Sequence, residues 1–451
     1  MGKGKFNEQT SIDYYEISKE IISYWNTNKI FEKSIKSRPE NKIFPFYEGP
    51  PSANGMPGIH HVMARTIKDI FCRYKTLKGY RVYRKGGWDT HGLPVELQVE
   101  KKLGITKDDI GNKISVEDYN EECRVAVMQF KESWEELTES IGYWLDIDDA
   151  YITFKNEYIE SIWWSLKELY KKGLLYKGYT IQPYSPAAGT GLSSHELNMP
   201  GAYKNIKDTS LTAQFKIQRN KKSEDLIGEN DCYFLAWTTT PWTLPANNGL
   251  AIGEKINYAL IETFNKYTES KINVIIAEKC IEKFFDPNNL KTSEELVYDK
   301  QNISYKILKT FKGKNLVGFD YEQLLPYVKA EKPAFTVVSG DFVTTEEGTG
   351  IVHISLTFGS DDFYVSRKNN LPGIFVKNEK NEEVPIVDKS GKFVKEIVDF
   401  AGLQVKSFSD VEGLTTDEKI SIKLKKENKA FDVKKYEHSY PHCWRTDKPI
   451  L

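Results

Sequence analysis

The chain has 451 residues, 39% of them hydrophobic, and its 63 lysines and arginines nearly balance its 64 aspartates and glutamates. This composition is typical of globular proteins and excludes disordered and collagen-like chains. Because the net charge is only −1, there is no global positive field, and any nucleic-acid partner has to be held by local patches.

The apolar runs of the chain are short. Runs such as residues 274–277 fall far below the ~18 residues that cross a bilayer, and no apolar segment of signal-peptide length follows Met1. The five cysteines form no C-x-x-C pair, which favours a reducing compartment. We therefore expect a cytoplasmic protein without a membrane partner.

The first hundred residues predict the start of a parallel sheet. A helix is expected within residues 1–40, and the apolar run 43–47 suits a buried strand, although it contains a proline. A loop rich in glycine and proline follows at 49–58, then an amphipathic helix over 63–74 and a strand at 81–85. Strand, glycine-rich loop, helix and strand in this order predict a βαβ unit in an α/β fold.

The predicted secondary structure changes from mostly helical to β-rich near residue 200. Residues 117–172 are predicted to be mostly helical, whereas short β-rich segments between turns occupy much of 210–355. A lysine-rich helix is expected at 415–428, followed by a polar, aromatic stretch. We predict three parts: 1–199 with the first half of the sheet, an inserted β-rich domain at 200–412, and a return segment at 413–451.

The loop that precedes the amphipathic helix is the most informative segment. Its sequence, Y-E-G-P-P-S-A-N-G-M-P-G-I-H-H at 47–61, is rich in small residues that let a ligand approach the backbone. His60 and His61 fall in the first helical turn, where free N–H groups and the helix dipole favour phosphate. A proline–glycine turn with surface histidines is the alternative, and this loop alone does not decide between them.

A second loop, G-W-D-T-H-G-L-P-V-E at 87–96, again follows a strand and opens a helix. Together the two loops resemble those of class I aminoacyl-tRNA synthetases, and in particular the isoleucyl group. The resemblance extends through the Y-P-H-C-W-R stretch at 440–445. It implies a Rossmann-like catalytic sheet and the partners isoleucine, tRNA(Ile) and ATP with Mg²⁺ as substrate.

The resemblance assigns roles to residues of both loops. The family signature is H-x-G-H, whereas this chain carries the permuted form G-I-H-H at 58–61. By position, Gly58, His60 and His61 would contact ATP, and His61 keeps the place of the last signature histidine. Pro50 would line the isoleucine pocket, and Asp89 would accept the ammonium group of the substrate. The alternative for Asp89 is a helix N-cap.

A threonine-rich segment stands inside the β-rich region, as W-T-T-T-P-W-T-L-P-A-N at 237–247. Three hydroxyls after a strand can orient water and ribose oxygens, but a threonine-rich strand end is the commoner explanation. With G-T-G-I-V-H at 348–353 and G-S-D-D-F at 359–363, the segment resembles the editing domain of isoleucyl, valyl and leucyl synthetases.

By that resemblance, Thr238, Thr239 and Thr240 would hold the terminal adenosine and the attacking water. His353 would lie beside the amino-acid side chain. Asp362 would anchor the α-amino group, and its neighbour Asp361 competes for this role.

A second site is needed because isoleucine and valine differ by one methylene. A hydrophobic pocket discriminates such a pair only ~10–200-fold, a limit for which these enzymes are the standard example. No Ser-His-Asp triad or metal-ligand cluster is visible in the insertion. We therefore expect hydrolysis by a positioned water without a covalent intermediate.

No structural zinc is expected. Related enzymes carry two cysteine pairs near the insertion, whereas this chain has Ser185, Ala188 and Thr446 at three of the four positions and keeps only Cys443. One thiolate cannot complete a tetrahedral zinc site. We expect Cys443 to be a packed or free thiol.

The second class I signature, K-M-S-K-S, is missing from the chain. K-I-S-I-K at 419–423 is a weak look-alike, which we interpret as a solvated helix face. The expected activity is that of an isoleucine–tRNA ligase with editing of valyl-tRNA(Ile), as a monomer, and a fragment ending at Leu451 is expected to retain only the editing part. A free-standing deacylase and a non-catalytic nucleotide- or RNA-binding fragment are the alternatives.

Overall fold

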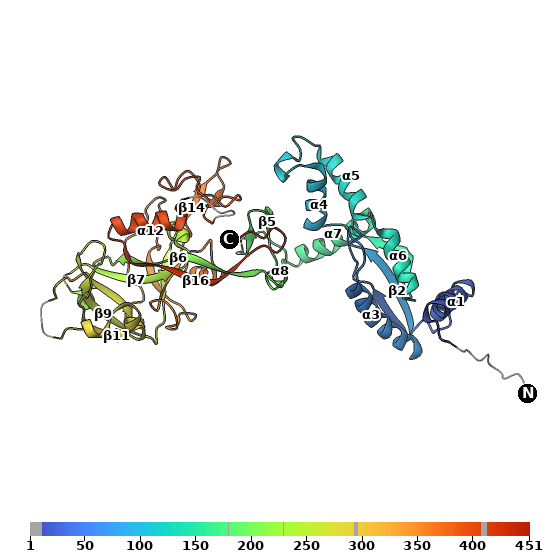
Figure 1. Cartoon of the computed structure of the whole chain (residues 1–451), viewed down its shortest axis with the longest axis horizontal. Coiled ribbons are helices and arrows are strands. Elements are labelled where there is room, and N and C mark those ends of the chain that lie inside the picture. The colour runs from blue at the N-terminus through green and yellow to red at the C-terminus, as the bar shows by residue number, and fades with distance from the viewer. Residues whose placement is uncertain (1–10, 179, 229, 293–295, 407–412) are drawn as a thin grey trace, which may run out of the picture. The chain divides into compact units, whose positions relative to one another are not determined.

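The computed structural model describes residues 11–178, 180–228, 230–292, 296–406 and 413–451 (Figure 1). The chain divides into two compact units, Met1–Gly178 and Tyr179–Leu451, which we describe separately. Among the described residues, no helix is both long enough and apolar enough to cross a membrane.

The first unit combines helices with a small sheet. Its elements are α1 (Tyr14–Thr27), α2 (Ile30–Lys36), β1 (Ile43–Tyr47), α3 (Ile59–Leu77), β2 (Arg81–Trp88), α4 (Leu93–Leu103), the 3₁₀ helix η1 (Lys107–Asp109), α5 (Val116–Val127), α6 (Lys131–Ser140), β3 (Asp146–Ile152) and α7 (Asn156–Lys171).

The sheet of the first unit is parallel, with the strand order β1-β2-β3. This confirms the predicted βαβ unit, in which α3 connects β1 to β2. Pro45 lies within β1, where it is tolerated because β1 is an edge strand. Gly87 of β2 leaves room for the Tyr151 ring, since a Cβ at this glycine would lie 2.3 Å from that ring.

Strand β3 was not predicted, because its sequence D-I-D-D-A-Y-I lies in a stretch that we expected to be mostly helical. It is an edge strand with no fully buried residue, so its sequence lacks the apolar alternation that marks a half-buried strand. Tertiary pairing with β2, and not local pattern, decides its conformation.

The second unit is rich in β structure. Its elements are β4 (Tyr184–Ser185), β5 (Thr190–Gly191), α8 (Ser194–Leu197), β6 (Tyr203–Lys216), α9 (Glu224–Ile227), β7 (Cys232–Thr238), η2 (Pro241–Ala246), β8 (Gly249–Ile252), β9 (Asn257–Phe264), β10 (Lys271–Ala277), η3 (Glu278–Cys280), α10 (Ile281–Phe284), η4 (Pro287–Asn289), β11 (Lys306–Lys312), η5 (Gly313–Asn315), β12 (Thr336–Ser339), β13 (Ile351–Ile354), α11 (Ser360–Lys368), β14 (Phe375–Lys377), β15 (Glu383–Pro385), α12 (Thr416–Lys426) and β16 (Ala430–Pro441).

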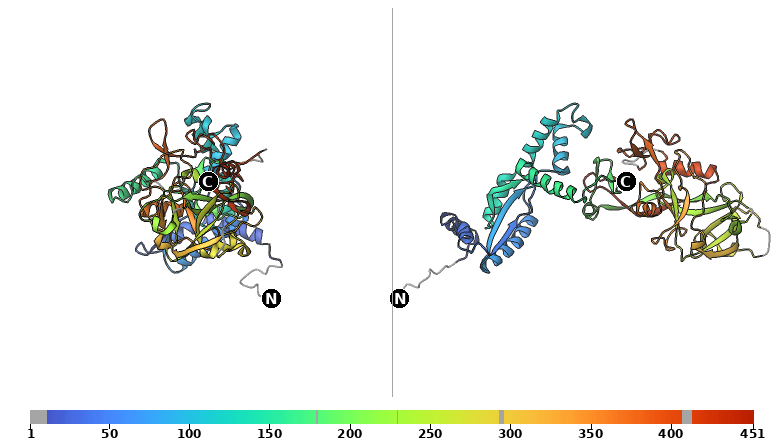
Figure 2. Two further views of the ribbon diagram at one scale, coloured as in Figure 1. Left: turned by 90° about the vertical axis from the view of Figure 1, so that its left-hand side faces the viewer. Right: turned by 180° about the vertical axis from the view of Figure 1, so that it is seen from behind.

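The main sheet of this unit has the order β11-β9-β10-β7-β6-β16 and carries the largest apolar core. Strands β6 and β16 lie more than 200 residues apart in the chain yet run side by side as an antiparallel pair, green and red in Figure 1 and Figure 2. The sequence predicted only a polar, aromatic stretch where β16 lies. Its charged and polar residues leave no clear apolar face, so pairing with β6 is not visible locally.

A smaller sheet, β12-β8-β13, packs with α11 around its own apolar cluster. Helix α12 packs against η2 and β16. The look-alike K-I-S-I-K lies inside α12, as predicted, but its interpretation as a solvated face was wrong in part. Ile420 and Ser421 are buried because this side of α12 covers the second unit.

Candidate functional sites

A pocket of about 400 Å³ lies at the start of α3 in the first unit. The loop between β1 and α3 forms one wall, and α3 and α6 supply the others. The charged and aromatic side chains that line it are Glu48, His61, Arg65, Lys68 and Trp134. Gly58 is the N-cap of α3, so His60 and His61 fall in its first turn, as the sequence predicted.

His61 is held in a defined orientation. The Gly58 N–H donates to His61 Nδ1 at 2.9 Å, and the imidazole lies 4.6 Å from the Trp134 ring, centroid to centroid. Burial, and then the neighbouring His60 and Arg65, lower the pKa of His61. In the neutral ring the proton therefore sits on Nε2, which makes this nitrogen a hydrogen-bond donor.

Glu48 is the buried acid of this pocket and was missed by the sequence analysis. It is 2% exposed, and its carboxylate pairs with Lys68 Nζ and accepts from the Tyr143 hydroxyl. Its backbone oxygen accepts from the Tyr151 hydroxyl at 2.7 Å. The available signal was an acidic residue directly after β1, at the end of a strand that opens a ligand loop.

Asp89 and Pro50 lie in the loops that follow β2 and β1. The Asp89 N–H donates to the Pro51 carbonyl at 3.0 Å, which joins the two loops. The alternative of Asp89 as a helix N-cap is wrong, because the N-cap of α4 is Gly92. Both Asp89 and Pro50 are half-buried.

The threonine-rich segment forms a tight turn after β7 in the second unit. Thr238 Oγ1 accepts from the Thr240 N–H at 3.0 Å and lies 3.2 Å from Thr240 Oγ1. Thr243 donates its hydroxyl to the Thr240 carbonyl at 2.9 Å. The Thr239 hydroxyl makes no hydrogen bond with the described residues, so it is available to a ligand.

His353 lies on β13 and meets this segment directly. Its Nε2 is 2.9 Å from Thr243 Oγ1, and because that hydroxyl donates to Thr240, Nε2 is the donor of the pair. Burial lowers the pKa of His353 to about 4, so the ring is neutral at pH 7. Its Nδ1 is therefore a buried acceptor, and it has no partner among the described residues.

Asp362 lies in the first turn of α11, and its Oδ2 accepts from the Ser355 N–H at 2.9 Å. Ser355 is two residues beyond His353, so this bond brings the acid to the histidine strand. Burial raises the pKa of Asp362 to about 6, the Ser355 bond opposes this rise, and the charge of Asp361 adds to it. Asp361 itself is exposed to solvent.

Several buried polar atoms on the segments that carry these residues have no hydrogen-bond partner among the described residues. They are His353 Nδ1, Ser355 Oγ, Thr357 Oγ1 and Trp242 Nε1. Since buried polar atoms in proteins are nearly always hydrogen-bonded, such a set marks a place where a polar ligand supplies the missing partners. The sequence analysis did not single out Ser355 or Thr357.

The four positions considered for zinc come together in the second unit. Ser185 is buried and accepts from the Ala188 N–H at 3.2 Å. Cys443 is a buried free thiol, as predicted. Burial favours a higher pKa for Cys443, but hydrogen bonds with Thr446 and Ser185 lower it overall. Among the described residues, no group of three or more histidines, cysteines or acids is placed to hold a metal.

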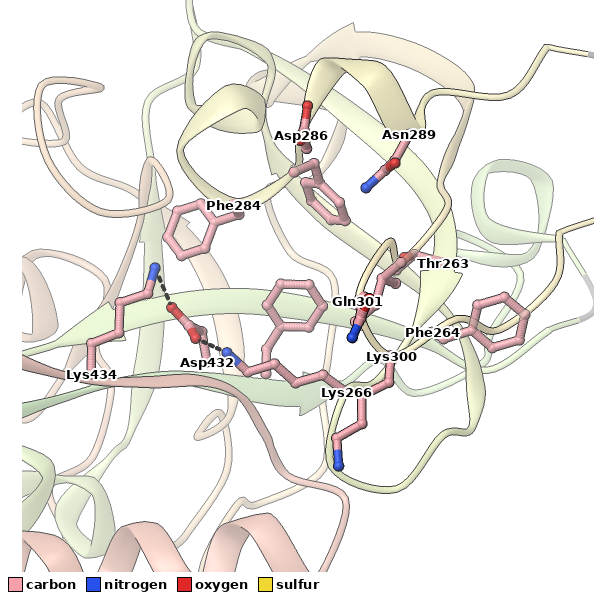
Figure 3. A pocket seen from close by; sticks show the side chains of 13 residues that line it. Thr263, Phe264, Lys266, Phe284, Asp286, Asn289, Lys300, Gln301, Asp432 and Lys434 are labelled. Carbon is pink, nitrogen blue, oxygen red and sulfur yellow. Dashed lines mark hydrogen bonds and ion pairs between the residues drawn. The ribbon is translucent and has the colours of Figure 1, made fainter.

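Another pocket of about 230 Å³ lies between β9, α10 and β16 (Figure 3). Lys266 and Lys434 both pair with the Asp432 carboxylate, and Lys434 Nζ lies 2.8 Å from it. Because Lys266 and Lys434 are both held by ion pairs with Asp432, we assign no anionic ligand to this pocket.

The family model for class I tRNA synthetases (I, L, M and V) matches residues 20–312. The chain therefore belongs to the class I tRNA synthetases. An isoleucine–tRNA ligase from Cytophaga hutchinsonii is 58% identical over 99% of this chain and 41% of its own length. Another from Clostridium tetani is 40% identical over 98% of this chain and 38% of its own length.

The chain thus spans about two fifths of the length of these curated relatives. Among solved structures, GlLeuRS-CP1 aligns with 50% of this chain and 98% of its own length, at 13% identity and a TM-score of 0.34. That similarity is too distant to bear on function.

Proposed function

We propose that the chain is part of an isoleucine–tRNA ligase, with a portion of the activation site in the first unit and a hydrolytic editing site in the second. The identity of 58% to an isoleucine–tRNA ligase supports the choice of amino acid. The boundaries that we propose remain 1–199 for the catalytic portion, 200–412 for the editing domain and 413–451 for the return segment.

In the first unit, the loop at 47–58 and the start of α3 would bind ATP and isoleucine. The free N–H groups of the first turn of α3 and the Nε2–H of His61 can donate to phosphate oxygens. Gly58 and His60 would approach the same nucleotide. Pro50 would contact the isoleucine side chain, and Asp89 would accept its ammonium group.

The observation that carries the editing proposal is the set of unpartnered polar atoms around His353. These atoms lie beside the Thr238–Thr240 turn and the Asp362 carboxylate, which are contributed by β7, β13 and α11. An aminoacyl-adenosine carries an ammonium group, ribose hydroxyls and an ester carbonyl, which together match such a set.

In the proposed reaction, Asp362 binds the α-ammonium of valine attached to tRNA(Ile). The hydroxyls of Thr238, Thr239 and Thr240 orient the terminal ribose and a water. That water attacks the ester carbonyl, and the ribose oxygen leaves with a proton. The neutral His353 bounds the space for the side chain, and no group of the protein forms a covalent bond.

The partners that we propose are tRNA(Ile), isoleucine and Mg²⁺-ATP as substrate, with a monomeric protein in the cytoplasm. The free state of all five cysteines supports a reducing compartment. A free-standing deacylase would not need the pocket at the start of α3, whose presence favours the ligase.

Deacylation of valyl-tRNA(Ile) by the wild-type chain tests the editing proposal. Asp362→Ala removes a charge-assisted hydrogen bond to the ammonium, worth about 1.5–3 kcal/mol, so the rate should fall roughly ten- to a hundredfold. Asp361→Ala is the matched control, because this neighbour is exposed, and it should change the rate much less. Equal effects, or the reverse order, would show that the wrong aspartate has been assigned.

A further inference from the structure

Arg65 stands out in the pocket at the start of α3. It lies one helical turn beyond His61, is only 5% exposed, and lines the same pocket as Lys68. Its guanidinium carbon lies 4.9 Å from the centroid of the Trp134 ring. The helix and the indole therefore fix this cation in place beside His61.

The hydrogen-bond donors of Arg65 are unused. A guanidinium carries five N–H donors, yet Arg65 donates to no acceptor among the described residues, and its Nε is fully buried. The acid whose charge acts on Arg65 is Glu48, and its two carboxylate oxygens already accept from Lys68 and Tyr143. Burying charged donors without acceptors is costly, so this arrangement is explained if an anionic ligand completes it.

Another buried arginine of the same unit shows what a structural role looks like. Arg84 is 2% exposed, and its guanidinium donates to Asp69 at 3.3 Å, to Thr76 at 2.9 Å and to the Trp144 carbonyl at 3.4 Å. Two of the lysines of the pocket in Figure 3, Lys266 and Lys434, are likewise paired, with Asp432. Arg65 has no such partners among the described residues; the Nε atoms of both arginines are buried and unpaired, so the difference lies in the other guanidinium nitrogens.

We propose that Arg65 binds an oxyanion of the substrate, either a phosphate group or a carboxylate, inside this pocket. The His61 Nε2–H and the start of α3 would donate to the same ligand. This inference deepens the proposed function of the first unit and rests on it. Lys68 is not available for this role, because Glu48 already holds it.

The test uses the whole chain at constant ionic strength. It measures the binding of sodium tripolyphosphate, isoleucine or isoleucinol by titration calorimetry, and the effect of each ligand on the melting temperature of the first unit. The wild type should melt at a higher temperature with an oxyanion ligand, because a ligand that binds only the folded state stabilises it. Arg65→Gln should lose this rise, with an affinity at least about tenfold weaker. Without ligand, Arg65→Gln should melt at the wild-type temperature or above, since an unpartnered cation is removed.

Arg84→Gln is the matched control and should lower the ligand-free melting temperature while leaving the tripolyphosphate affinity of the folded protein unchanged. If Arg65→Gln loses affinity for tripolyphosphate only, the ligand of Arg65 is a phosphate. If Arg65→Gln loses affinity for isoleucine but not for isoleucinol, the ligand of Arg65 is the carboxylate. Arg65→Lys keeps a cation but lacks the planar guanidinium, so its affinity for the ligand should lie between those of the wild type and Arg65→Gln.

The inference would be overturned if Arg65→Gln, like Arg84→Gln, melted at a lower temperature than the wild type and kept its ligand affinity. It would also be overturned if no oxyanion stabilised the wild type. If Arg65→Gln does not fold, an Arg65→Lys affinity equal to the wild type would also overturn it. Deacylation by the second unit does not involve Arg65, so a failure here is distinguishable from a failure of the editing proposal.

Discussion

The two units differ in how completely they bury their apolar residues. In the second unit, Phe234, Tyr258 and Tyr321 are fully buried in one continuous core. In the first unit, helices α3 and α7 leave large apolar side chains exposed, among them Leu77 at 82% and Trp163 at 69%. The second unit therefore has a complete core of its own, whereas the first keeps amphipathic faces uncovered.

The largest expected effect comes from separating the units. The protein 179–451 should melt cooperatively, because its core is formed from its own residues. The protein 1–178 should bind a hydrophobic dye strongly and melt with low cooperativity. Circular dichroism melts and dye fluorescence would measure both. The comparison would be contradicted if the protein 1–178 melted cooperatively and did not bind the dye.

Within the second unit, Thr243→Val should lower the deacylation rate by roughly tenfold with little change in KM. The change removes the bond to His353 and leaves buried partners unsatisfied, which costs about 1–3 kcal/mol. Thr263→Val is the matched control, since its buried hydroxyl donates to the Ser304 carbonyl in another part of this unit. If the two variants were equally slow, the loss would reflect general destabilisation.

The pH dependence sharpens the contrast between the two titrating residues of the editing site. Asp362 must be ionised to bind an ammonium, and its pKa is raised to about 6, so kcat/KM should fall about tenfold per pH unit below that value. His353, with a pKa of about 4, should add no second step between pH 5 and 8. Because the pKa of Asp362 is raised from 3.8 to about 6, the free energy of unfolding should fall as the pH rises from about 4 to about 6, and it should change no further through this group above pH 6.

The smallest expected effect concerns metal. Because Ser185, Ala188 and Thr446 stand where ligands would be needed, the purified protein should contain well under one zinc per chain. Dialysis against a chelator should leave the melting temperature unchanged. Stoichiometric zinc that survives dialysis would show that this part of the second unit has been misread.

The sequence predicted those elements whose own pattern encodes them. Helix α3 has apolar residues at helical spacing, and the placement of His61 in its first turn follows from Gly58. Strand β1 is the predicted apolar run, but the expectation that it is buried was wrong, because it is an edge strand with no buried apolar residue. Strands β3 and β16 were missed because both are edge strands with charged residues, so their conformation depends on partners far along the chain.

The residues of the candidate sites also fall into those that a local pattern reveals and those that depend on distant contacts. Asp362 and the threonine turn stand in recognisable motifs, whereas Glu48 and Arg65 gain their meaning from contacts with Tyr143 and Trp134, about 70 to 95 residues away. Burial and unpartnered donors exist only once those distant segments meet. No local pattern carries that information.

The central claim is that the second unit holds a hydrolytic site that selects against the smaller amino acid. Its most direct test is the deacylation rate of valyl-tRNA(Ile) and of isoleucyl-tRNA(Ile) by this chain, both at saturating tRNA. We predict measurable hydrolysis of the valyl ester and at least roughly tenfold slower hydrolysis of the isoleucyl ester. Equal rates for the two esters, or no hydrolysis of either, would contradict the account.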